Sequence, residues 1–388
     1  MATQPIQPVW SPAPEPKTKL GVYRQLAPNA GVHVSPIQLG AMSIGDQWHK
    51  IGMGDMSKED SFKLLDAYYE AGGNFIDTAN GYQDETSELF IGEWMEKRGA
   101  RDQIVLATKY TTNYKRGEPA SFGQKVHYTG NNVKSMLISV EASLKKLRTS
   151  YIDILYVHWW DYATSVEEVM NGLHTLVSQG KVLYLGISDT PAWIVAKANA
   201  YARYHGKTPF VIYQGLWSIL RRDFEREIIP MALSEGMALA PWGVLGQGRI
   251  RTDEEEARRR ESGEKGRVMH GPQWERNENE KKISQALEKV AKEVGAKHVT
   301  SVATAYVMQK VPYVFPILGG RKVEHLMDNI EALDISLTPE HIAYLESVLP
   351  FDVGFPQSSF GDGSDYNRMF KSTGHFQKWP AQQAIRPN

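Results

Sequence analysis

Hydrophobic and polar positions follow two alternating patterns along most of the chain. Short apolar runs rich in β-branched residues are followed by longer stretches with the 3.6-residue spacing of amphipathic helices. The runs that predict strands are Ile37–Ala41, Asn74–Thr78, Ile104–Lys109, Ile152–His158, Leu183–Ser188, Phe210–Gln214, Ala238–Trp242 and Val314–Leu318. The stretches that predict helices are Lys58–Ala71, Thr86–Lys97, Asn131–Leu147, Ser165–Gln179, Pro191–Tyr204, Phe224–Ser234, Lys281–Val294, Val299–Gln309, Val323–Leu333 and Pro339–Val348.

This alternation predicts one α/β domain. Parallel strands need crossover connections, and eight apolar strands each followed by a helix close most economically into a (β/α)8 TIM barrel. We expect the barrel over residues 21–350, a proline-rich arm over residues 1–20 and an extension over residues 351–388, with both terminal arms disordered. The active site of such a barrel lies at the carboxyl ends of its strands.

Two stretches depart from the alternation, and each follows the carboxyl end of a predicted strand. Residues 110–130 are rich in glycine, threonine and tyrosine, and residues 249–282 are dense in arginine, glutamate and lysine. A charge-dense segment is usually a solvated or mobile part of the surface. Its position next to the predicted active site also suits a lid, which we rank second.

Composition narrows the classes of function. The 44 basic and 45 acidic residues nearly cancel, so no long-range field attracts nucleic acid or an anionic membrane. The absence of cysteine excludes disulfides and thiolate catalysis. No apolar run reaches the roughly 18 residues of a membrane span, and the N-terminus lacks the apolar core of a signal peptide. We therefore expect a cytoplasmic protein whose partners are small molecules.

Four ionisable residues stand at or just after the ends of neighbouring predicted strands: Asp77, Tyr82, Lys109 and His158. A buried lysine needs a partner, and an aspartate on the adjacent strand can provide it. Such a pair beside a phenol lowers the pKa of the phenol, because the ammonium group stabilises the phenolate. A phenol of this kind could protonate a developing alkoxide and recover the proton in reverse, which points to carbonyl reduction. His158 could orient the carbonyl.

Other interpretations remain open for these residues. Taken singly, an aspartate or a lysine at a strand end is more often part of a structural ion pair, and a tyrosine or histidine there is more often packed in the core. A (β/α)8 isomerase or hydrolase that uses Asp77 and His158 would need a phosphate or metal site. We find no cluster with metal-ligand spacing, so no metal is expected.

The segment from Gly73 to Tyr82, with Glu88 and Gly92 beyond it, resembles the signature of the aldo-keto reductase superfamily. The similarity extends over roughly residues 34–349 and is greatest to fungal aryl-alcohol dehydrogenases and to norsolorinic acid reductase-like enzymes of secondary metabolism. It implies an oxidoreductase in which Tyr82 is the general acid and base, Asp77 and Lys109 tune it, and His158 orients the carbonyl. It also implies NADPH or NADP+ as cofactor, bound without a G-x-G-x-x-G fingerprint.

The resemblance also assigns cofactor residues by position. Ser188, Asp189 and Gln214 would hold the nicotinamide carboxamide, although many relatives carry asparagine where Asp189 stands, and an aspartate lacks the amide donor. Trp242 would stack on the ring. A glycine-containing loop would cover the pyrophosphate, namely Gly243, Val244, Leu245 and Gly246. Near the last strand, Arg321 would bind the ribose 2′-phosphate, which favours NADP over NAD, with Gly320, His325, Asp328 and Asn329 beside it.

Aromatic residues near the strand ends are candidates for a substrate wall, and they suggest an aromatic carbonyl or alcohol as substrate. They are Trp48, Tyr110 and Trp159. An alternative function is an NADPH-binding redox sensor similar to the β subunits of potassium channels. Those subunits usually carry asparagine where His158 stands, so the histidine favours an enzyme. The natural substrate, the direction of reaction, its stereochemistry and the oligomeric state stay open.

Overall fold

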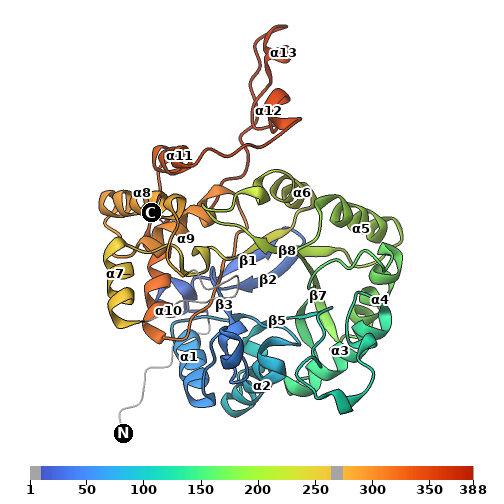
Figure 1. Cartoon of the computed structure of the whole chain (residues 1–388). Helices are drawn as coiled ribbons and strands as arrows, with labels where there is room; N and C mark the ends of the chain where they lie inside the picture. The colour runs from blue at the N-terminus through green and yellow to red at the C-terminus, as the bar shows by residue number, and fades with distance from the viewer. Residues whose placement is uncertain (1–9, 264–273, 388) are drawn as a thin grey trace.

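The computed structural model describes residues 10–263 and 274–387, and its centre is a barrel of parallel strands (Figure 1). The strand order is β10-β3-β4-β5-β6-β7-β8-β9. The barrel closes where the amide of Leu239 in β9 donates to the carbonyl of Tyr313, just before β10, and the carbonyl of Leu239 accepts from Phe315. The strands are β3 (Gln38–Gly40), β4 (Phe75–Asp77), β5 (Val105–Tyr110), β6 (Ile152–Val157), β7 (Val182–Ser188), β8 (Phe210–Leu216), β9 (Ala238–Trp242) and β10 (Ile317–Leu318). The predicted TIM barrel is confirmed.

Helices surround the barrel at all the predicted places. They are α1 (Lys58–Glu70), α2 (Thr86–Arg98), α3 (Val133–Lys146), α4 (Val166–Ser178), α5 (Ala192–Tyr204), α6 (Ile228–Glu235), α8 (Glu278–Val294), α9 (Val299–Lys310), α10 (Val323–Ile330) and α11 (Pro339–Val348). Side chains cap several of them: Ser57, Asn132, Ser165 and Thr338 each accept a hydrogen bond from the first turn. Over the described parts of the chain, none of the helices combines the length and apolar character needed to cross a bilayer.

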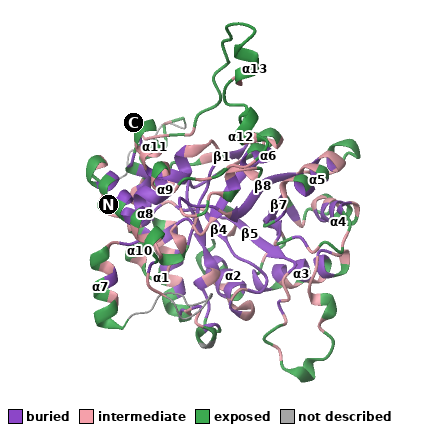
Figure 2. Ribbon diagram, turned by 45° about the horizontal axis from the view of Figure 1, so that its top comes forward, coloured by how far each residue is buried: buried purple, intermediate pink, exposed green. Residues whose placement is uncertain are grey.

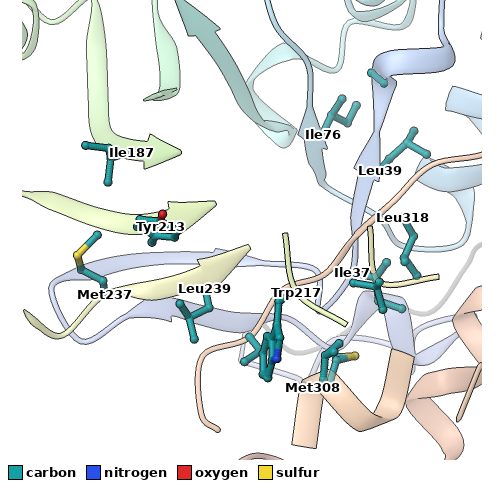
Figure 3. Packing of buried hydrophobic residues seen from close by; sticks show 14 of the residues in the cluster. Ile37, Leu39, Ile76, Ile187, Tyr213, Trp217, Met237, Leu239, Met308 and Leu318 are labelled. Carbon is teal, nitrogen blue, oxygen red and sulfur yellow. The ribbon is translucent and has the colours of Figure 1, made fainter. Parts of the chain in front are cut away.

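The pleat of each strand sorts its side chains between two cores. Outward-facing residues such as Ile76, Ile187 and Leu239 pack against the helices, and Figure 3 shows them on separate strands. Inward-facing residues such as Phe75 and Ile154 fill the barrel. Because successive side chains on a strand alternate in direction, this sorting also fixes which residues face inward at the carboxyl ends.

A β-hairpin that the apolar pattern did not predict closes the other end of the barrel. Its strands are β1 (Arg24–Ala27) and β2 (Ala30–Val34), paired antiparallel. The buried Leu26 and Val34 belong to the same cluster as the inward-facing residues of the barrel strands. The hairpin therefore acts as the floor of the barrel core and leaves the carboxyl ends for chemistry.

The charge-dense segment after β9 is ordered around a buried ionic network rather than solvated throughout. It contains helix α7 (Asp253–Ser262), and Arg251, Glu256 and Arg276 are only 2–4% exposed. A single oxygen of Glu256 accepts from Arg251 at 2.9 Å and from Arg276 at 2.9 Å. The expectation of a solvated segment is therefore wrong for these residues. Residues 264–273 of the suggested lid lie outside the described residues.

The C-terminal extension has a defined conformation, contrary to the expected disorder. It projects from the barrel with the short helices α12 (Gln357–Phe360) and α13 (Arg368–Lys371) and is largely exposed (Figures 1 and 2). Its start is anchored by Phe351, whose ring lies under the guanidinium of Arg226 at 4.5 Å. Its end returns to the barrel, where Arg386 donates to the carbonyl of Gln309 at 3.1 Å.

Candidate active site

The inward-facing residues at the carboxyl ends of β4, β5 and the chain just after β6 are polar. Asp77 ends β4, Lys109 is the last inward-facing residue of β5, and His158 directly follows β6. The apolar positions beneath Lys109, Val105 and Ala107, belong to the barrel core. The same alternation that fills the barrel with apolar side chains therefore brings these three polar groups together on its open end.

Lys109 is fully buried and is the centre of the hydrogen-bond network. Its Nζ donates to Asp77 Oδ1 at 2.6 Å and to the carbonyl of Thr78 at 2.6 Å, and it lies 3.4 Å from Tyr82 Oη. Burial acts to lower the pKa of Lys109, but Asp77 and Tyr82 together outweigh it and the pKa is raised. Asp77 uses its other oxygen to accept from Gln214 Nε2 at 2.9 Å. Lys109 is therefore a fixed ammonium group that faces the phenol.

Tyr82 lies between two other rings at this end of the barrel. Its ring makes edge contacts with Trp48 at 6.1 Å and with His158 at 6.0 Å between centroids. Burial raises the pKa of Tyr82, and Lys109 opposes this without reversing it, so the pKa is above its ordinary value. The sequence prediction of a lowered pKa is wrong for the protein alone, because burial outweighs the ammonium group.

The turn that carries Tyr82 has an unusual backbone. Gln83, Asp84 and Glu85 all have positive φ, at 52°, 46° and 83°, a conformation that costs residues other than glycine free energy. The buried Gln83 carboxamide compensates with four hydrogen bonds. Its oxygen accepts from the amides of Gln47 and Trp48, and its nitrogen donates to the carbonyls of Met42 and Gly54, all at 2.9–3.1 Å. Gln83 thus holds the loop with Trp48 against the turn with Tyr82.

Thr112 positions His158. Its hydroxyl shares a hydrogen bond with His158 Nδ1 at 3.2 Å and accepts from Trp159 Nε1 at 3.0 Å. Burial lowers the pKa of His158 to about 3, with a further contribution from the charge of Lys109. The imidazole is therefore neutral at physiological pH and can act as a hydrogen-bond group rather than as a cation. Sequence reasoning missed Thr112, which lies in the irregular stretch after β5.

Two further residues of the signature, Glu88 and Gly92, lie on α2 and fix its position against β5 and α3. The buried Glu88 accepts from Thr108 at 2.6 Å and pairs with Lys146 at 2.8 Å. A Cβ atom on Gly92 would lie 2.3 Å from the carbonyl oxygen of Lys146, so only glycine lets α2 approach α3 this closely. These residues are structural, and they fix the helix that follows the Tyr82 turn.

The group expected to hold the nicotinamide surrounds Asp189. Its carboxylate accepts from Ser188 Oγ at 3.2 Å and from Trp242 Nε1 at 3.3 Å. Asp189 is exposed and has a positive φ of 42°, a conformation that aspartate tolerates better than most residues. Gln214 belongs to the same layer, but its amide nitrogen is engaged with Asp77. Gln214 therefore links the expected cofactor group to the Tyr82 network.

The loop after β9, expected to cover the pyrophosphate, turns at two glycines with positive φ. Gly243 and Gly246 have φ values of 71° and 57°, and a Cβ atom on either would lie within 3 Å of a leucine side chain below the loop. Val244 is buried and Leu245 is half-buried. Between Gly243 and Gly246 the backbone groups are therefore suited to contact a phosphate, and the buried side chain of Val244 anchors the loop.

The residues near the last strand are brought together only in part. The guanidinium of Arg321 packs over Gly54, since a Cβ atom there would lie 3.1 Å from Arg321 Nη1, and no carboxylate of residues 10–263 or 274–387 pairs with it. Gly320 adjoins His325, which is exposed. Asp328 pairs instead with His298 at 3.8 Å, and Asn329 is buried in α10. Arg321 is thus a cation that the described residues leave without a carboxylate partner.

The three aromatic residues expected to form the substrate wall lie in different environments. Trp48 contacts Tyr82, as described above, and its Nε1 donates to Asp84 at 3.1 Å. Trp159 is 37% exposed and is held by Thr112. Tyr110 is fully buried and donates to the carbonyl of Asn131, which leads into α3. Its assignment to the wall is wrong, because Tyr110 follows the inward-facing Lys109 and so points outward into the helix layer.

Within the described ranges, no group of three or more histidine, aspartate or glutamate side chains is placed to hold a metal ion. The chemistry of this end of the barrel is that of a phenol, an ammonium group, a carboxylate and a neutral imidazole.

Comparisons with known proteins identify the family of the chain. The profile of the Aldo/keto reductase family matches residues 36–350. An aryl-alcohol dehydrogenase (NADP+) of Phanerodontia chrysosporium is 69% identical over 98% of this chain and 99% of its own length. A putative aryl-alcohol dehydrogenase of Saccharomyces cerevisiae is 58% identical over 91% and 93%, and norsolorinic acid reductase A of Aspergillus parasiticus is 54% identical over 89% and 86%. The chain therefore belongs to the aldo/keto reductase family.

Proposed function

We propose that the protein is an NADPH-dependent oxidoreductase that interconverts aromatic aldehydes or ketones with their alcohols. The observation that carries this proposal is the position of Lys109, whose Nζ lies 2.6 Å from Asp77 and 3.4 Å from Tyr82 Oη. This arrangement suits a phenol that gives and recovers a proton. The names of two similar proteins support NADP as cofactor and an aryl alcohol as substrate.

The residues present fit NADPH. The exposed Arg321, which pairs with no carboxylate of the described residues, offers a guanidinium for a 2′-phosphate, and the backbone of the Gly243–Gly248 loop can approach a pyrophosphate. Ser188 and Gln214 supply a hydroxyl and an amide near the carboxamide position, and the partly exposed indole of Trp242 lies beside them. When bound, the cofactor would supply the hydride.

The side chains account for the proton and the charge. The carbonyl oxygen of the substrate would lie between Tyr82 Oη and the neutral His158, each able to donate a hydrogen bond. As the oxygen becomes an alkoxide it takes the Tyr82 proton, and Lys109 stabilises the phenolate that remains. In alcohol oxidation the phenolate accepts the proton instead. The Asp77 pair keeps Lys109 charged through both directions.

The direct test of the proposal is a substrate panel. Aromatic and aliphatic aldehydes are mixed with the protein and NADPH, and the absorbance of the reduced nicotinamide is followed. We expect substrate-dependent oxidation of NADPH that is faster with aromatic aldehydes. Tight NADPH binding without turnover on any carbonyl would contradict the proposal and favour the sensor function.

Replacing Arg321 with methionine should weaken NADPH binding by about 10–100-fold, the range expected when charge-assisted hydrogen bonds to a phosphate are lost. NADH lacks the 2′-phosphate, so its affinity should change little. The measurement is the dissociation constant of each cofactor by quenching of tryptophan fluorescence. Equal weakening of both cofactors would show that Arg321 does not bind the 2′-phosphate. Lys322→Met, at the adjacent exposed position, is the matched control.

Replacing Trp48 with leucine should raise KM for aromatic aldehydes by about 2–10-fold, because ring–ring contacts of this type contribute about 0.5–1.5 kcal/mol. KM for an aliphatic aldehyde of similar size should change less. The exposed Trp193 on α5 provides the control substitution Trp193→Leu. A larger effect on KM for the aliphatic substrate would contradict the assignment of Trp48 to the substrate wall.

A further inference from the structure

The carboxylate of Asp189 forms no ion pair within residues 10–263 and 274–387. Both groups that donate to it, Ser188 Oγ and Trp242 Nε1, are neutral. No lysine or arginine in the described parts of the chain lies within 4 Å of the Asp189 carboxylate. Lys109, the basic residue of the site, pairs with Asp77 instead. Asp189 is also exposed, so a ligand bound at this end of the barrel can reach its charge.

Asp189 is fixed close to the reacting groups. Its backbone amide donates to the carbonyl of Gln214 at 3.0 Å, and a Cβ atom on Gly215 would lie 3.6 Å from its Oδ1. Its charge contributes to raising the pKa of Tyr82 and of Tyr213. The carboxylate thus lies at the ends of β7 and β8, within electrostatic range of the phenol.

The charges of the site do not cancel when Asp189 is ionised. The Asp77–Lys109 pair is neutral overall, and burial keeps His158 uncharged by lowering its pKa to about 3. Partial removal of water by the surrounding protein atoms raises the pKa of Asp189 to about 6. Hydrogen bonds from Trp242 and Ser188 and the charge of Lys109 act to lower this pKa. At neutral pH this group of four side chains therefore carries one net negative charge, and that charge is on Asp189.

We infer that Asp189 makes the protein discriminate between the two oxidation states of its cofactor, holding NADP+ more tightly than an uncharged side chain at this position would. The inference rests on the proposed function, which places the nicotinamide beside Ser188, Gln214 and Trp242. The oxidised ring carries one positive charge and the reduced ring carries none. A carboxylate beside the ring stabilises only the charged form, whereas a hydrogen bond to the carboxamide is open to both.

The expected size of the effect follows from Coulomb's law. Two unit charges about 6–8 Å apart, at the effective dielectric constant of about 20 that suits protein sites, change a binding constant by about 10–100-fold. Solvent that reaches the exposed carboxylate moves the effect toward the lower end of this range. The 2′-phosphate and the adenosine are common to both cofactors, so the ratio of the two dissociation constants isolates the charge of the ring.

The test compares the wild type with Asp189→Asn, which keeps the shape and tolerates the positive φ of this position. The dissociation constants of NADP+ and NADPH are measured by tryptophan fluorescence at about pH 8 and about pH 5. At pH 8 the substitution should weaken NADP+ relative to NADPH by about 10–100-fold. In the wild type the same preference should fall at pH 5, where Asp189 is protonated, and in Asp189→Asn the ratio should not depend on pH.

The outcomes separate the inference from the function on which it rests. Equal loss of both cofactors in Asp189→Asn would make Asp189 a carboxamide acceptor only and overturn the inference. An unchanged ratio would overturn it as well. If the wild type bound neither cofactor, the proposed function would fail. Asp102→Asn removes an acid at the amino ends of the strands, where Asp102 accepts from Tyr151, and should leave the ratio unchanged.

Discussion

Tyr82→Phe is expected to lower the rate of aldehyde reduction by about 10²–10⁴-fold, the contribution typical of a positioned general acid. The substitution removes the one hydroxyl that lies 3.4 Å from Lys109 Nζ and leaves the ring between Trp48 and His158. The developing alkoxide then has no proton donor backed by a cation. The measurement is kcat for NADPH oxidation at saturating aldehyde, with the NADPH dissociation constant as a check on binding.

The pH dependence distinguishes the two directions of the reaction. Burial raises the pKa of Tyr82 above its ordinary value, so the phenol is protonated throughout the neutral range and is ready to donate. Alcohol oxidation needs the phenolate, so its rate should rise with pH, while the rate of reduction should fall only at high pH. Both limbs should disappear in Tyr82→Phe. His158 should add no limb near pH 6, because its pKa is held at about 3.

A control separates loss of the proton donor from loss of structure. Tyr69→Phe removes a hydroxyl that donates to Gln103 on the outside of the barrel, and it should leave turnover within about twofold. If Tyr82→Phe kept more than about a tenth of the wild-type rate, Tyr82 would not be the general acid. The proton would then have to come from His158 or from water.

The sequence was sufficient for the barrel because its signal is repeated. Each apolar run that forms a strand is followed by a helical stretch. The outward-facing residues Ile76, Ile187 and Leu239 occupy equivalent places on their strands. The hairpin of β1 and β2 lacks such repetition. Its strands are short, β2 contains Gly31, and they bury few large residues, so their stability comes from the barrel core they cover.

The site was predictable where it depends on strand register and not where it depends on loops. Asp77, Lys109 and His158 follow from the ends of strands. Tyr110 was misplaced because a strand end was taken as the criterion without the direction of the side chain. Gln83 and Thr112 act through loop conformations, and hydrogen bonds between distant loops leave no periodic signal in the sequence.

The sequence also does not predict the ion pairs of the charge-dense segment after β9. Composition predicts solvated side chains, yet the fold buries two arginines against one glutamate. Arg251 also donates to the carbonyls of Gly248 and Trp274, and Arg276 donates to the carbonyl of Arg251. The network thus ties the loop that follows β9 to residues 274–276. The order of charges in this segment does not identify Glu256 as the acid that becomes buried.

Glu256→Gln is expected to reduce the free energy of opening of this segment by about 3–5 kcal/mol, the range observed when one partner of a buried ion pair is removed. The amide keeps the shape but removes the carboxylate that pairs with Arg251, and it leaves Arg276 paired with the exposed Asp253. Burial acts to raise the pKa of Glu256, but hydrogen bonds from Arg276 and Arg251 outweigh it and lower the pKa to about 2. The contribution is therefore complete above the unfolded pKa of about 4.3 and is lost as pH falls toward 2.

The opening free energy can be measured by amide hydrogen exchange at neutral pH, because exchange reports local as well as global opening. Protection should fall in α7 and at the start of α8, while the amides of β5 and β6 should keep theirs, since the network contacts neither strand. Glu255→Gln is the matched control: its partner Arg259 lies one turn away on the same helix, and both side chains are partly exposed. Such a pair contributes about 0.3–0.5 kcal/mol. If the two substitutions had equal small effects, the buried network would not be what holds this segment against the barrel.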